Sequence, residues 1–129
     1  MIRDIFKAVK FPVVFVLILI GIHFYSTKYG VRLSHFGVYP REFKGLFGIL
    51  SSPFIHGDWK HLFNNSVPLI VLGSALFHFY KRLAIRVWIY SIIFTGVLVW
   101  LGGRPSFHIG ASGLVYALAT FLFFSGFIR

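Results

Sequence analysis

The chain contains no cysteine, which excludes disulfide bonds and thiolate metal sites. Acidic residues are almost as scarce, because only Asp4, Glu42 and Asp58 oppose 13 lysines and arginines, and the formal net charge is +10. The basic residues stand in short clusters between apolar runs. This arrangement favours anionic lipid headgroups over nucleic acid as the partner of the positive charge.

Charged residues as a class are also rare. They make up 12% of the 129 residues, whereas 57% are hydrophobic and 20% are aromatic. This composition lies far outside that of soluble proteins and indicates a membrane protein. A soluble domain of this length would expose much of that apolar surface and aggregate. The length suits a single domain.

Four apolar segments predict an all-α, polytopic membrane fold. We expect transmembrane helices at about residues 11–26, 60–80, 85–102 and 109–128. Pro12 is well placed at the start of the first helix. The basic residues 1–10 before it resemble the start of a signal peptide. No small-residue cleavage site follows Ile20 and further apolar segments come later, which favours a retained first helix.

The segment between residues 26 and 52 does not follow the pattern of spans. It is too polar to cross a membrane and too aromatic for a disordered linker. We expect a long interfacial loop with short amphipathic helices, the clearest over about residues 40–50. Its aromatic residues suit the headgroup zone, and they are Tyr29, Phe36, Tyr39, Phe43 and Phe47.

The distribution of lysine and arginine predicts the orientation. With four spans, three basic groups lie on one side of the membrane, which is then cytoplasmic; the four bases of the 26–52 loop, on the other side, oppose this assignment. We expect a multi-pass protein of the bacterial inner (plasma) membrane with a cytoplasmic N-terminus. The three groups are Arg3, Lys7 and Lys10, then Lys81, Arg82 and Arg86, then Arg129.

Ser112 is the first candidate for chemistry. It stands in Gly110-Ala111-Ser112-Gly113, at the start of the last apolar segment. One interpretation is helix packing, because small residues let transmembrane helices approach closely. The other is catalysis, because the flanking glycines leave room for a substrate and the free N–H groups of a helix N-terminus suit an oxyanion. The tetrapeptide alone fits both interpretations.

Polar residues also gather from His56 to Asn65, at the entrance of the second long apolar segment. His61 and Asn65 are four residues apart and therefore share one helix face. A polar pair in lipid is costly unless it meets partners or water. The pair either holds the helix bundle together, or donates hydrogen bonds to a developing oxyanion. Asn64 points about 100° away round the helix.

The remaining titratable residues give weaker signals, and we expect neither a metal nor a cofactor. His56 and His61 are five residues apart, off one helix face, and no His-Glu-x-x-His motif is present. Tyr116, four residues after Ser112, is either an ordinary buried aromatic or a ring packed against an imidazole that serves Ser112. We interpret the other histidines as structural residues of the interface: His23, His35, His78 and His108.

In combination, these motifs resemble those of the rhomboid intramembrane serine proteases. The shared features are the order of His56, the His61-x-x-x-Asn65 pair, the Gly-Ala-Ser-Gly segment two spans later, and the long aromatic loop. The resemblance covers nearly the whole chain. It implies four helices of a rhomboid-like six-helix bundle, with a Ser–His dyad in a water-filled cavity below the outer membrane surface. It also implies a serine endopeptidase that cleaves transmembrane protein substrates.

The resemblance assigns a role to each candidate residue. Ser112 would be the nucleophile, and its backbone N–H would complete an oxyanion hole with His61 and Asn65. The 26–52 loop would be the membrane-embedded loop typical of the family. The remaining residues would support the site: His56 by shaping the cavity, Tyr116 by stacking on the catalytic histidine, and Gly110 and Gly113 by leaving space.

The general base of that family is a histidine on the sixth span, which four spans do not include. We therefore expect the chain to be part of a longer protease and to have negligible activity alone, because triad-type sites lose most of their rate without the base. One alternative is a catalytically inactive rhomboid-like protein that binds transmembrane helices; the intact Ser112, Asn65 and His61 argue against it. Another is a channel or transporter subunit, which the lack of paired acidic residues within the spans disfavours.

Overall fold

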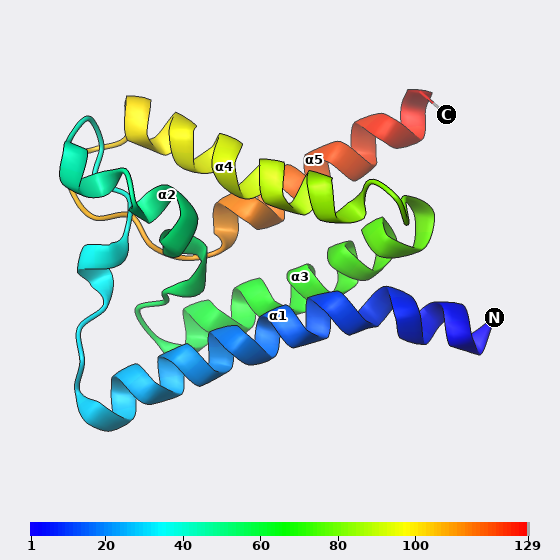
Figure 1. Ribbon diagram of the computed structural model, residues 1–129, viewed down its shortest axis with the longest axis horizontal. Coiled ribbons are helices and arrows are strands. Elements are labelled where there is room, and N and C mark those ends of the chain that lie inside the picture. Colours follow the sequence, from blue (N-terminus) through cyan, green and yellow to red (C-terminus); the bar gives the residue numbers. More distant parts are fainter. Residues whose placement is uncertain (129) are drawn as a thin grey trace.

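The computed structural model describes residues 1–128 and is all-α over that range. Figure 1 shows α1 and α3 running side by side, with α4 across the bundle from them and α5 packed against both α3 and α4. Helices α1, α3 and α4 are long and apolar enough to cross a membrane, and α5 is a shorter apolar helix. The elements are α1 (Ile2–Tyr29), η1 (Ser34–Phe36), η2 (Phe43–Gly45), α2 (Gly48–Ser51), η3 (Ser52–Phe54), α3 (Trp59–Phe79), α4 (Ala84–Gly102) and α5 (Ser112–Ile128).

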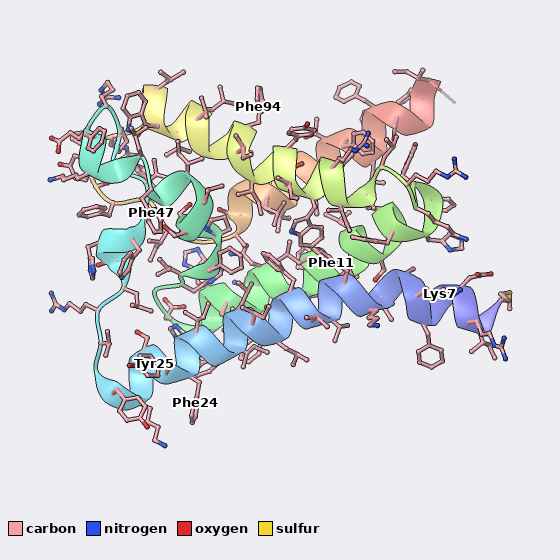
Figure 2. All side chains as sticks on the ribbon, viewed as in Figure 1. Lys7, Phe11, Phe24, Tyr25, Phe47 and Phe94 are labelled. Atoms are coloured by element: carbon pink, nitrogen blue, oxygen red, sulfur yellow. The ribbon has the colours of Figure 1, made fainter. Side chains whose placement is uncertain are left out.

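The core lies between the four long helices. On α3, Leu62, Leu69 and Leu76 are fully buried; they are seven residues apart and so form one stripe along the helix. Trp88 of α4 meets two rings of α1 edge to face, with centroids 5.1 Å from Phe11 and 5.0 Å from Phe15. Figure 2 shows Phe11 directed into the bundle and Phe24 and Phe94 directed away from it, and Tyr25 is also exposed. The outward aromatics form a surface suited to lipid.

Helices α1 and α3 pack tightly against each other at Gly73. A Cβ atom on Gly73 would lie 2.7 Å from Pro12 Cγ and 2.8 Å from Trp88 Cζ3. Neither ring can move without disturbing the core, because Pro12 and Trp88 are both fully buried. The absence of a side chain at Gly73 therefore sets the helix spacing, as small residues do in membrane proteins.

Replacing Gly73 by alanine is expected to lower the free energy of unfolding by about 1–3 kcal/mol, the usual cost of overpacking a core. The matched control is Gly21→Ala on α1, where no atom lies within 4 Å of the added methyl. The measurement is thermal unfolding of each variant in detergent, followed by circular dichroism. Equal midpoints for the two variants would show that the contact at Gly73 does not limit packing.

Two details of the predicted helices were wrong. Pro12 does not start the first helix, because α1 begins at Ile2 and contains Pro12 in its interior. Residues 2–11 contain no helix breaker, and the proline ring, which removes one helical hydrogen bond, fills the space beside Gly73. The loop contains short helices as expected, but residues 40–50 do not form one helix, because η2 (Phe43–Gly45) and α2 (Gly48–Ser51) are separate elements. There the backbone folds back on itself, with Gly45 against Tyr39.

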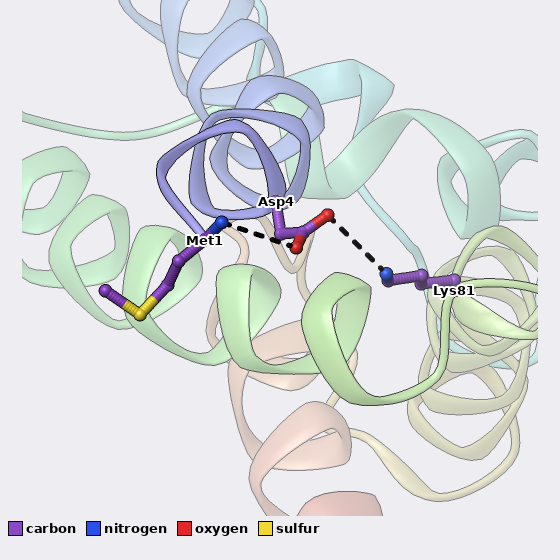
Figure 3. A network of polar contacts seen from close by, with 3 residues as sticks. All are labelled: Met1, Asp4 and Lys81. Atoms are coloured by element: carbon purple, nitrogen blue, oxygen red, sulfur yellow. Dashed lines mark ion pairs between the residues drawn. The ribbon is translucent and has the colours of Figure 1, made fainter.

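The two ends of the bundle differ in character. At one end, the N-terminus of α1 meets the turn between α3 and α4, where Asp4 lies 4.0 Å from the Met1 amino group and 3.9 Å from Lys81 Nζ (Figure 3). These ion pairs are exposed and stabilise the fold little. The opposite end carries the long loop after α1 and the start of α5 (Figure 1). The N-terminus and the α3–α4 turn thus share one end, away from Ser112.

Candidate functional site

Ser112 is the first residue of α5, and its side chain is exposed. The Val115 N–H donates to the Ala111 carbonyl at 3.0 Å and opens the helical hydrogen-bond ladder. The N–H groups of residues 112–114 come before that bond and have no acceptor within the helix. Ser112 therefore presents a hydroxyl beside backbone donors that can stabilise negative charge.

The helix starts three residues later than residue 109, the predicted start of the fourth span. Gly110 has φ 105°. This backbone conformation is not helical, and residues other than glycine adopt it rarely. Its N–H donates to the Ser52 carbonyl at 2.9 Å. Gly110 thus turns the chain sharply into α5 and brings the backbone close to η3.

The segment before Ser112 is held by the long loop that follows α1. Val38 and His108 exchange backbone hydrogen bonds of 2.9 and 2.8 Å in an isolated antiparallel bridge. Gly37 packs against the same stretch, since a Cβ there would lie 2.5 Å from the His108 carbonyl oxygen. The loop predicted to be interfacial therefore also fixes the backbone that positions Ser112.

His56 and Asn65 lie next to that backbone. Asn65 Nδ2 is 3.1 Å from His56 Nε2, and the Ala111 N–H is directed at the same ring nitrogen at 3.3 Å. Both side chains are buried, each with 7% of its surface exposed. Because Nε2 accepts from two donors, the imidazole is neutral and carries its proton on Nδ1. His56 thus links α3 to the segment that leads into Ser112.

The neutral form of His56 is favoured by its surroundings. Burial, with smaller contributions from the imidazoles of His61 and His23, lowers the pKa of His56 from 6.5 to about 4, while the carboxylate of Asp58 acts in the opposite direction. The ring therefore remains an acceptor for Ala111 and Asn65 at neutral pH.

The lowered pKa of His56 predicts acid sensitivity. As the pH falls from 6.5 towards 4, the unfolded chain takes up a proton at His56 while the folded chain does not. Stability is therefore lost across that window and levels off below about pH 4, with a total of about 3 kcal/mol. The measurement is the thermal midpoint in detergent between pH 7.5 and pH 4. His56→Gln should remove this dependence and the exposed His35→Gln should keep it; equal pH profiles for both variants would contradict the assignment.

A cavity of 220 Å³ opens beside Ser112. Helices α4 and α5 meet at its wall, because a Cβ on Gly113 would lie 3.2 Å from Thr95 Cβ. The hydroxyl of Thr95 is occupied, since it donates to the Ser91 carbonyl at 2.7 Å. The cavity is bounded by both the helices and the long loop, through Val38, Ser52, Pro53, Thr95, His108, Gly110, Ser112 and Tyr116 among others.

The structure brings some predicted site residues together and leaves others apart. Asn65, His56 and Gly110 converge, because a Cβ on Gly110 would lie 3.8 Å from Asn65 Nδ2 and 3.9 Å from His56 Cδ2. His61 is exposed, and its backbone N–H donates to the Asp58 carboxylate that caps α3, at 2.7 Å. Within residues 1–128, no hydrogen bond joins the His61 ring to Asn65 or Ser112. The role of His61 in an oxyanion hole therefore stays a prediction.

Tyr116 lies along α5 with 74% of its surface exposed, at the edge of the Ser112 cavity. Its stacking on a catalytic histidine also stays a prediction. Over residues 1–128, no group of three or more histidine or acidic side chains is placed to hold a metal ion.

Two contributors to the site were missed in the sequence. The Ser52 carbonyl holds Gly110, and Thr95 packs on Gly113. Both contacts join segments about 20 to 60 positions apart in the chain, and no local pattern marks them. The only signal was the small size of Gly113, which indicated close packing without naming the partner.

Comparison with known proteins identifies the family of the chain. The sequence model of the rhomboid domain family matches residues 44–129 of the chain. An uncharacterized protein of Mycobacterium tuberculosis is 36% identical over 124 residues, which cover 89% of this chain and 51% of that relative. An uncharacterized protein of Mycobacterium leprae is 38% identical over 93 residues, covering 65% of this chain and 36% of the relative.

The chain spans about half the length of the mycobacterial relatives that match most of it. No solved structure matches it significantly. The family match covers the polar entrance of α3, the whole of α4 and the Ser112 segment. The chain is an integral membrane protein with an all-α fold, and it belongs to the rhomboid family.

Proposed function

We propose that the protein is an intramembrane serine endopeptidase that hydrolyses peptide bonds in or near transmembrane segments of other membrane proteins. The observation that carries this proposal is the position of Ser112 at the first turn of α5, where the backbone N–H groups have no acceptor within the helix. Ser112 directly follows Ala111, whose N–H is directed at His56, and Gly110, which lies against the Asn65 amide. A nucleophile and oxyanion donors at one point are the elements of an acyl-transfer site.

In the proposed mechanism, the Ser112 hydroxyl attacks the scissile carbonyl. The developing oxyanion receives hydrogen bonds from the Ser112 N–H and from Asn65, whose Nδ2 carries a second proton besides the one directed at His56 Nε2. His61 would join this hole if its ring turned inward. A serine needs an adjacent base, and we assign that role to a histidine outside residues 1–129. No cofactor takes part.

The site suits substrates that arrive from the membrane. Hydrolysis needs water at a site below the membrane surface, and the cavity beside Ser112 includes polar residues such as Ser52 and His108 in its lining. A scissile bond inside a helix cannot reach Ser112 with its carbonyl free, because that carbonyl is already bonded within the helix. Helix-destabilising residues near the cleaved bond therefore favour cleavage.

We further propose that the N-terminus is cytoplasmic and that the site lies near the outer surface of a bacterial plasma membrane. The contact between Asp4 and Lys81 places the N-terminal basic cluster and the α3–α4 turn at the same end of the bundle. Together these segments carry Arg3, Lys7, Lys10, Lys81, Arg82 and Arg86, and such clusters stay in the cytoplasm.

A second candidate function is the binding of transmembrane helices without cleavage. An apolar groove of 670 Å³ runs between α4 and α5 and shares Thr95, Gly113 and Tyr116 with the Ser112 cavity. Its exposed aromatic rings, Tyr90 and Phe94, are the kind of surface that receives another helix. A groove of this kind serves both a protease and a binder.

In the deciding experiment, the native protein is purified from its own membrane and reconstituted in liposomes together with a single-span substrate. Mass spectrometry then identifies any cleavage products, and photo-crosslinking records substrate binding. New termini within or next to the substrate's span support the protease. Crosslinks without products support the binder, and the absence of both would sink the two proposals together.

A further inference from the structure

A second cavity, of 280 Å³, lies at the C-terminal end of α1, and Ile109 lines both it and the Ser112 cavity. It is enclosed by the last turns of α1, the segment that follows them, and the residues just before α3. Its polar lining residues are His23, Ser26, Arg32, Ser34 and His56.

His23 gives the first reason to expect a ligand there. Its side chain has 4% of its surface exposed and packs edge-on against Trp59, with ring centroids 4.6 Å apart. Neither of its ring nitrogens has a hydrogen-bond partner among residues 1–128. A buried donor or acceptor that is left unpaired destabilises the fold. A polar ligand in the adjoining cavity would remove that cost.

His56 gives a second, independent reason. Its Nε2 accepts from Asn65 and Ala111, so the proton is on Nδ1, and this N–H is also buried without a partner in the described chain. His56 is part of the lining of this cavity, and its Nε2 accepts a hydrogen bond from the segment that leads into Ser112. An acceptor bound to Nδ1 would hold the tautomer that the Ser112 segment requires.

The charge around the cavity favours an anion. Arg32 lines it, and no acidic residue does. The sequence contains no aspartate or glutamate between Asp4 and Glu42. Asp58, two residues after His56, already accepts the His61 N–H as the cap of α3. The available groups are therefore a guanidinium and ring N–H donors, which suit a phosphate oxygen.

The position of the cavity indicates which phosphate is present. Phe24, next to His23 on α1, points away from the bundle (Figure 2), and Tyr25 and Tyr29 are exposed as well. Aromatic residues at the end of a membrane helix lie at the level of the lipid headgroups. We propose that this cavity binds the phosphate of a phospholipid headgroup, with Arg32 supplying the charge and the rings of His23 and His56 supplying N–H donors.

The test measures binding to the whole protein in an uncharged detergent, by calorimetry and by tryptophan fluorescence, because Trp59 contacts His23. The titrants are dihexanoyl phosphatidic acid, sodium phosphate, and dihexanoylglycerol as the lipid without phosphate. The test variant is Arg32→Gln. The matched control is Lys28→Gln, which removes the same charge four residues away, from a side chain that lies over the rings of Phe24 and Tyr29 outside the cavity.

We expect saturable binding of the phosphatidic acid, weakened at least about tenfold by Arg32→Gln, the loss of one charge-assisted contact. Lys28→Gln should change it by less than about twofold. If sodium phosphate bound equally well and depended on Arg32 in the same way, the cavity would be a site for free phosphate and not for a lipid headgroup. Equal losses in the two variants, binding of dihexanoylglycerol, or no saturable binding would overturn the proposal. Since Arg32 is exposed, its replacement does not disturb the core.

Discussion

Ser112→Ala is expected to reduce cleavage of a transmembrane substrate by at least about 10⁴-fold, because the loss of a serine nucleophile removes almost all of the rate in enzymes of this chemistry. The fold should survive the change. The Ser112 side chain is exposed, and its hydroxyl makes no hydrogen bond within residues 1–128. The backbone donors at the start of α5 remain, so the variant should still bind its substrate. The measurement compares product formation in liposomes by the native protein and by the same protein carrying Ser112→Ala.

The control for this prediction is Ser106→Ala, an exposed serine in the loop that leads to α5. It removes the same hydroxyl from a position six residues away, outside the cavity that Ser112 lines, and should leave the rate unchanged. If Ser112→Ala retained a tenth of the wild-type rate or more, Ser112 would not be the nucleophile. If wild type and variant crosslinked to substrate equally and neither released products, the protein would be a binder.

The sequence predicted those features of the fold that depend on local pattern. Long apolar segments predicted the helices α3, α4 and α5, and the position of Ser112 before the last apolar segment predicted that it stands near the beginning of a helix. Pro12 shows the limit of this reasoning. A proline favours a helix start when judged alone, but here it is in the interior because Gly73, more than 60 positions away, accommodates its ring.

The residues around Ser112 show the same limit. The spacing of His61 and Asn65 places both on one face of α3, yet Asn65 is buried and His61 is exposed. The ring within hydrogen-bond distance of Asn65 belongs to His56, which lies in the loop before α3. Helical periodicity describes only residues inside the helix. It therefore gave no information about His56, or about the contact between Ser52 and Gly110.

The second large effect concerns Asn65. We expect Asn65→Ala to lower kcat by about 10²–10³-fold with little change in KM, because one oxyanion donor acts on the transition state and hardly at all on the bound substrate. Its amide lies beside Gly110 and His56, at the backbone that leads into Ser112. The matched control is Asn64→Ala, which removes the same amide from an exposed position on another face of α3.

A purely structural role for Asn65 predicts a different result. The substitution would then cost only the bond to His56, about 1 kcal/mol of stability, and would raise KM or lower the amount of folded protein. The two cases separate when kcat, KM and the thermal midpoint are measured on the same preparations. A lowered kcat at nearly unchanged KM and midpoint assigns Asn65 to the oxyanion hole. A lowered midpoint with unchanged kcat, or the same loss of kcat in Asn64→Ala, would show that Asn65 is not an oxyanion donor. The backbone N–H groups of α5 would then be the donors at this site.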